Sequence, residues 1–200
     1  MENLQLQLND IINKWNLLNH PFYKAWSEGT LPAEKLKTYA GEYGTYINCI
    51  ADQWRTAGNE AIAAEEQMHF GLWQDFAKSI GVNSIDSTVP EVKHLVDLSK
   101  HYSNTKATSL GALYAFEAQQ PHTTTSKLEG LRKYYSNLSA DDKYFVIHVD
   151  DVQEAEILFD KMQQLSTAER HQAVEACENA CQALWNALSG IMGDADCVMN

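Results

Sequence analysis

The chain has 200 residues, of which 44% are hydrophobic, so it can bury a complete core without dividing into two domains. Its 27 acidic and 15 basic residues give a formal charge of -12, and a surface this acidic repels phosphate backbones and anionic lipids, which argues against binding to nucleic acid or to a membrane. No apolar run approaches the roughly 18–20 residues of a membrane span, and the polar residues Glu2, Asn9 and Asp10 do not fit a signal peptide, so we expect one cytoplasmic domain over residues 1–200.

The spacing of apolar residues predicts an all-helical protein, because apolar positions recur at three and four residues and almost nowhere alternate. Pro32 and Ser166 favour helix starts, Gly81 favours a helix end, and Pro121 either kinks a helix or begins a new one. The expected helices cover, in chain order, about residues 4–18, 32–54, 59–80, 91–102, 107–120, 121–135, 139–165 and 166–192.

Three of these helices carry carboxylate or imidazole groups within apolar runs. Glu66 and His69 are three residues apart, so a helix places them on one face; Glu65 is the neighbouring alternative. Glu117 lies in the most apolar helix, where an ionised carboxylate costs several kcal/mol unless it is paired or bound to a metal. In the helix expected over residues 139–165, three further groups share a face pairwise: His148, Asp151 and Glu154.

A helical bundle that turned these faces inward would form a carboxylate-rich metal site. Each stretch also has an ordinary explanation. Glu66 and His69 fit an exposed pair, Glu117 fits a solvated helix edge or a hydrogen bond to Tyr or Gln, and the acidic residues after His148 fit a solvated face. Neither a nucleophile with a matching base nor a glycine-rich phosphate loop is evident, which disfavours hydrolase and nucleotide-binding functions.

Several motifs in a fixed order resemble the heme-oxygenase-like helical family. They are NHPFYKAWSEGTL at residues 19–31, LKTYAGEY at 36–43, HFGLWQDF at 69–76, ALYAFEAQQP at 112–121 and KLEGL at 127–131, followed by Tyr144, Phe145 and His148. That family includes the TenA thiaminases, the pyrroloquinoline-quinone synthase C (PqqC) proteins and di-iron oxidases typified by the Chlamydia protein associating with death domains (CADD). The resemblance spans about residues 10–165, is closest to the CADD-like group, and implies a heme-oxygenase-like bundle of seven to eight helices.

The CADD-like group binds two metal ions, and the resemblance implies which residues here are the ligands. They are Glu65 or Glu66, His69, Glu117, His148 and Asp151. The last helix of the group resembles His-x-x-x-Asp-x-x-His, whereas His148 and Asp151 are only three residues apart and Glu154 stands at the place of the final histidine. This departure adds negative charge at the second metal position. The implied ions are Fe/Fe or Fe/Mn, with dioxygen as co-substrate.

CADD-like proteins are linked to the synthesis of 4-aminobenzoate for folate by oxidative cleavage of one of their own tyrosines, with a lysine supplying the nitrogen. The matching residues are Tyr23 for the sacrificed ring and Lys127 for the amine, and Tyr39 matches an aromatic residue near the site. The resemblance also implies an external reductant and a homodimer. As an alternative to these catalytic roles, Tyr23 could serve only to pack the core, and Lys127 would ordinarily be exposed to solvent.

Three other functions stay open at the level of sequence. A di-iron oxygenase could act on an external small molecule such as an amino acid or a fatty acid. A TenA-like protein could bind thiamine-related heterocycles through Glu42, although the cysteine expected near Glu117 is missing. A metal-free interaction protein could use the same bundle as a partner surface.

Overall fold

The computed structural model describes residues 3–149 and 153–193, and these form helices without any strand. The elements are α1 (Leu4–Lys14), the 3₁₀ helix η1 (Leu17–Asn19), α2 (Pro21–Glu28), α3 (Ala33–Thr56), α4 (Glu60–Ser79), α5 (Pro90–Tyr102), α6 (Lys106–Glu117), α7 (Gln120–Tyr134), η2 (Ser136–Leu138), α8 (Lys143–Ile147), α9 (Gln153–Gln163) and α10 (Thr167–Met192). None of the helices in this described part combines the length and the apolar character that a membrane span requires.

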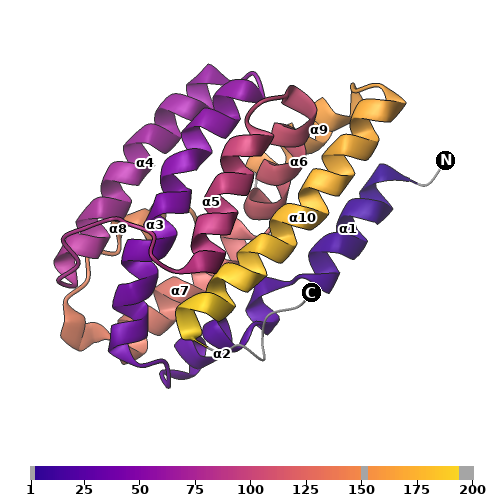
Figure 1. The fold of residues 1–200 in the computed structure, drawn as a ribbon. Coiled ribbons are helices and arrows are strands. Elements are labelled where there is room, and N and C mark those ends of the chain that lie inside the picture. Colours follow the sequence, from indigo (N-terminus) through magenta and orange to yellow (C-terminus); the bar gives the residue numbers. More distant parts are fainter. Residues whose placement is uncertain (1–2, 150–152, 194–200) are drawn as a thin grey trace.

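The helices pack into one bundle (Figure 1). The long helices α3 and α4 lie side by side, and α5 packs against α3. The longest helix, α10, packs against α5, α6 and α1. On α6, an added Cβ at Gly111 would collide with the backbone of Ala173 on α10, so only glycine permits this close approach. The α6–α10 contact therefore sets the depth at which α6 lies in the bundle.

Most predicted helices are confirmed, with boundaries that follow local capping. His20 accepts a hydrogen bond from the backbone of Phe22 and Pro21 begins α2, a short helix that the apolar spacing did not predict. Pro121 does not kink the previous helix: α6 ends at Glu117, and Pro121 lies in the first turn of a new helix, α7, which begins at Gln120. Ser166 and Glu169 form a capping box at the start of α10.

The prediction of a single helix over residues 139–165 was wrong. The chain there forms α8, which ends at Ile147, and α9, which begins at Gln153. His148 consequently lies at the C-terminal end of one helix and Glu154 in the first turn of another. The prediction that His148 and Glu154 share one helical face fails for this reason, and Asp151 lies outside the described residues.

Candidate metal centre

Glu66 and His69 occupy the face of α4 that is turned into the bundle. Asn59 caps this helix by accepting a hydrogen bond from the backbone of Ile62. Glu66 is 2% exposed, and its Oε1 lies 2.8 Å from Nδ1 of His69. Glu65, one residue earlier, is exposed. Between the two alternatives, the structure therefore brings Glu66 to the cluster and leaves Glu65 on the surface.

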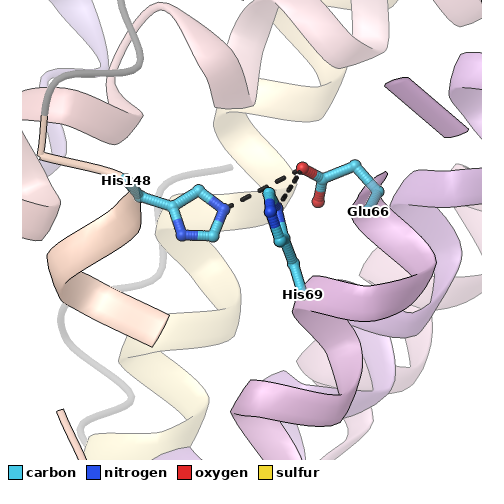
Figure 2. Close-up of side chains that lie close together, drawn as sticks. All are labelled: Glu66, His69 and His148. Carbon is cyan, nitrogen blue, oxygen red and sulfur yellow. Dashed lines mark hydrogen bonds and ion pairs between the residues drawn. The ribbon is translucent and has the colours of Figure 1, made fainter. Parts of the chain in front are cut away.

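His148 reaches the same point from the end of α8 (Figure 2). Its ring is 1% exposed, and Nδ1 lies 2.6 Å from the carbonyl oxygen of Tyr144. Because a carbonyl oxygen only accepts, Nδ1 must donate, which leaves Nε2 of the neutral ring as an acceptor. Nε2 lies 3.9 Å from Oε1 of Glu66, too far for a hydrogen bond. A buried imidazole held in this way presents the lone pair of Nε2 to a cation.

One ligand atom from each of Glu66, His69 and His148 lies within 4.8 Å of the other two. Figure 2 shows the three side chains pointing toward one another from α4 and from the end of α8. The rings of His69 and His148 have centroids 4.6 Å apart, so both imidazoles border the same small volume. One carboxylate with two imidazoles is a donor set that suits iron and other transition metals.

Two more carboxylates lie beside this cluster. Glu117, the last residue of α6, is 2% exposed, and Glu154, in the first turn of α9, is 5% exposed. The two carboxylates are close enough to interact electrostatically, and the indole Nε1 of Trp54 donates to Oε1 of Glu117 over 3.1 Å. Buried carboxylates can share a position like this only when a proton or a cation lies between them.

The electrostatics of the site favour a bound cation. Burial, the negative charge of Glu154 and that of Glu66 raise the pKa of Glu117 well above its usual range, and the Trp54 hydrogen bond only partly opposes them. Burial raises the pKa of Glu66 as well, but the imidazoles of His148 and His69 outweigh burial and leave it lowered. A divalent cation would neutralise the repelling carboxylates and fill the position that Nε2 of His148 faces. The residues therefore fit a metal.

Tyr23, Tyr39 and Lys127 form a second buried group. Their side chains come from α2, α3 and α7, and each is at most 2% exposed. The hydroxyl oxygens of Tyr23 and Tyr39 are 3.4 Å apart, and Nζ of Lys127 lies 5.8 Å from the centroid of the Tyr23 ring. Lys127, which sequence reasoning would ordinarily place in solvent, is enclosed in the core next to Phe145.

Three contacts contribute to these sites that were not predicted from the sequence. Trp54 holds Glu117, the hydroxyl of Thr123 lies near that of Tyr23, and the carbonyl group of Tyr144 fixes the tautomer of His148. The first two contacts join different helices, so no spacing along the chain signals them. The third links residues four apart and could have been expected from a helical turn ending at His148.

Glu42 has a structural role. Its carboxylate accepts hydrogen bonds from the backbone and hydroxyl of Thr88, the shortest at 2.6 Å, and from the backbone of Val89 at 3.1 Å. These groups immediately precede α5, so Glu42 on α3 takes the place of an N-terminal cap. The carboxylate suggested as a holder of thiamine-related heterocycles is thus used to join α3 to α5.

Known proteins resemble the chain over nearly its whole length. A family model described as iron-containing redox enzyme matches residues 54–186, and a model of the TENA/THI-4/PQQC family matches residues 7–54. The chain is 29% identical to a 4-aminobenzoate synthase of Nitrosomonas europaea, covering 92% of this chain and 89% of that protein. It is 28% identical to a 4-aminobenzoate synthase of Chlamydia pneumoniae, covering 94% of this chain and 95% of that protein.

A solved structure from Shewanella denitrificans, a domain of unknown function with a heme oxygenase-like fold, has the same architecture. It superposes with a TM-score of 0.75 over 98% of this chain and 94% of that chain at 19% sequence identity. The heme-oxygenase-like helical bundle expected from the sequence is confirmed. At this identity the likeness concerns the fold alone.

Proposed function

The chain belongs to the family of iron-containing redox enzymes, and from this premise we propose that it makes 4-aminobenzoate from its own Tyr23 in an oxygen-dependent reaction. The names of the relatives from Nitrosomonas europaea and Chlamydia pneumoniae support this product. The observation that carries the proposal is the buried amine of Lys127 against the ring of Tyr23, 5.8 Å from its centroid. A lysine is rarely buried without a carboxylate partner unless its amine has a function.

Glu66, His69 and His148 would hold one metal ion, and Glu117 with Glu154 would complete a second position next to Glu66. We propose iron at one or both positions, with manganese as the alternative at the second. Bound iron would supply the redox chemistry by which dioxygen oxidises a phenol. The role of the bundle is to keep this carboxylate-rich centre dry and its ligands oriented through the contacts of Tyr144 and Trp54.

The product defines what must happen to Tyr23. The ring of 4-aminobenzoate corresponds to the tyrosine ring, its carboxyl carbon to Cβ, and its nitrogen replaces the phenolic oxygen. The Cα–Cβ bond must therefore break as Cβ is oxidised to the carboxyl carbon, which leaves Cα in the main chain. The phenolic oxygen must leave as water when Nζ of Lys127 bonds to the ring, and the Cε–Nζ bond must then break with oxidation of Cε to an aldehyde. Dioxygen is the oxidant, and an external reductant supplies the remaining electrons.

The protonation states of the two groups suit this transfer. Burial lowers the pKa of Lys127 from 10.5 to about 7, so near neutral pH a large fraction of the amine is uncharged and nucleophilic. Burial raises the pKa of Tyr23 to about 12, although the neighbouring hydroxyl groups of Tyr39 and Thr123 oppose the rise. The phenol therefore keeps its proton, and the two hydroxyl neighbours hold it in place.

A continuous series of aromatic contacts links Tyr23 to the metal centre. Tyr23 meets Tyr39 through the hydroxyl groups, and the ring of Tyr39 lies 5.6 Å from that of Trp73. Trp73 lies 4.8 Å from Tyr144, which in turn lies 4.3 Å from His148, all between ring centroids. These side chains offer a path by which an electron can leave the Tyr23 phenol without contact between Tyr23 and the metal ligands.

The experiment uses protein produced with tyrosine that carries heavy carbon in the ring and at Cβ. After loading with ferrous iron, reduction and exposure to unlabelled dioxygen, the 4-aminobenzoate released should carry every heavy carbon, at no more than one product per chain. Tyr23→Phe should release none. Tyr135→Phe, which loses a hydroxyl that donates to the carbonyl of Leu31, is the matched control and should keep the activity.

Mass analysis of the peptide containing residue 23 completes the test. Tyr23 should be lost in proportion to the product formed. Labelled product with an intact Tyr23 would reject the assignment of Tyr23, and unlabelled product over several turnovers would instead indicate an external substrate.

A further inference from the structure

A cavity of about 670 Å³ lies between α3, α4, α5 and the segment 82–89, apart from the residues assigned to the metal centre. Each of the three helices contributes lining residues four positions apart: Thr45 and Cys49, Gln74 and Lys78, Val96 and Lys100. Residues at this spacing lie above one another on one helical face, so each helix presents a continuous stripe to the cavity. Its volume is within the range of pockets that hold small organic molecules, roughly 300–1,000 Å³.

The segment that closes the cavity is held against α3. A Cβ added to Gly41 would lie 3.3 Å from the carbonyl oxygen of Ser84, and one added to Gly44 would lie 3.0 Å from Cγ2 of Ile85. Both glycines thus let the segment approach the helix closely. At its far end Glu42 accepts the hydrogen bonds of Thr88 and Val89. The cavity wall is therefore fixed before any ligand arrives, which lowers the entropic cost of binding.

The charge of the cavity is opposite to that of the molecule. Lys78 and Lys100 line it, and its lining includes no aspartate or glutamate, although the whole chain has a formal charge of -12. Within the described residues, neither lysine forms an ion pair with a carboxylate. Two ammonium groups without an ion-pair partner on one preformed cavity attract an anion.

The remaining lining has both apolar and polar character. Phe70 and Ile85 offer apolar contact, and Asn48, Asn83 and Ser87 offer hydrogen-bonding groups. We propose that this cavity binds a small organic anion, whose carboxylate or phosphate lies between Lys78 and Lys100 and whose apolar body packs against Phe70 and Ile85. The proposal does not depend on the reaction assigned to Tyr23.

The test measures the binding of two fluorescent anions, naphthoate and naphthyl phosphate, to the full chain with and without iron. At least one should bind saturably with a stoichiometry of one, and the preferred one identifies the headgroup. The double variant Lys78→Met with Lys100→Met should weaken this binding at least about tenfold, as expected when charge-assisted contacts are lost. Lys93→Met, on the same helix as Lys100 but outside the cavity lining, is the control and should bind as the unaltered chain does.

Neutral naphthalenemethanol should not compete with the bound anion. Raising the salt concentration should weaken the binding of the anion, because salt screens exposed charge pairs. Binding is read directly from fluorescence, so the result is independent of catalytic activity. Failure of both anions to bind saturably, or equal affinity in the double lysine variant, would overturn the proposal.

Discussion

Glu65 and Glu66 are neighbours of the same chemical type whose surroundings differ, which makes them a matched pair for testing the metal centre. Glu66 is 2% exposed and within 2.8 Å of His69, whereas Glu65 is exposed. Glu66→Gln should lower the affinity for ferrous iron on the order of 100-fold or more, since even residues that only orient a ligand contribute 10- to 100-fold. Glu65→Gln should leave it unchanged.

The measurement is an anaerobic titration with ferrous iron in competition with a chelator. Circular dichroism of both variants checks that each is folded. Equal iron affinity in the two variants would remove Glu66 from the ligand set.

The pKa of Lys127 predicts how the stability of the folded chain depends on pH. An unfolded lysine has a pKa of about 10.4, whereas burial lowers the pKa of Lys127 in the folded chain to about 7. Between these values the unfolded state binds more protons, so the stability of the metal-free chain should rise with pH over this window. Below about pH 7 the full cost of burying the amine applies.

Lys127→Met should therefore raise the free energy of unfolding by a few kcal/mol at about pH 6, and by clearly less at about pH 9. Urea unfolding of the metal-free chain at both pH values measures this difference, and Lys93→Met corrects for loss of an exposed lysine. The same gain at both pH values would show that the folded chain does not lower the pKa of Lys127.

At the scale of single residues, sequence pattern identified some site residues and missed others for a physical reason. Glu66 and His69 are on one helix, so their spacing predicts that they lie together. Glu117 was recognisable because its helix has almost no other polar surface. Trp54 could not be recognised as a site residue from the sequence. Its hydrogen bond to Glu117 joins α3 to α6, and contacts between helices leave no periodic pattern in the sequence.

Among the helices, the placement of α6 is the structural feature on which Glu117 depends. Gly111→Ala would push a Cβ into the backbone of Ala173, which cannot move aside as a side chain could. We expect a loss of stability of about 1–3 kcal/mol, together with weaker iron binding because Glu117 is displaced. Thermal unfolding and the iron titration measure the two effects.

Gly71→Ala on α4 is the matched control. An added Cβ there meets nothing within 4 Å, so this change should stabilise the chain by about 0.5–1 kcal/mol through helix propensity alone. If both glycine variants were equally stable, the close contact of α6 with α10 would not set the position of α6.

The boundary between α8 and α9 could not be predicted from the local sequence pattern. The helix expected over residues 139–165 is replaced by α8 and α9. The residues of α8 after Lys143 are aromatic or β-branched and form helices less readily than the glutamate, alanine and leucine residues of α9. The end of α8 at Ile147 places His148 on the cluster, with its Nδ1 on the carbonyl of Tyr144. The weak helix propensity of the α8 residues fits the early end of α8, which the spacing of apolar residues does not signal.

For the molecule as a whole, the apolar spacing was sufficient to predict a helical bundle, and the order of motifs was sufficient to predict its heme-oxygenase-like type, which the Shewanella denitrificans structure bears out. The cavity near Lys78 and Lys100 could not be predicted. It depends on the position of the segment 82–89, which Glu42 and two glycines of α3 determine through contacts between distant parts of the chain.

The central claim is that the bundle interior holds redox-active iron on Glu66, His69 and His148. The most direct measurement is anomalous diffraction at the iron absorption edge from crystals grown anaerobically with ferrous iron. We expect an anomalous peak within bonding distance of these three side chains, with a second metal position between Glu66, Glu117 and Glu154. A bundle interior without any anomalous peak, or iron found only at surface carboxylates, would contradict it.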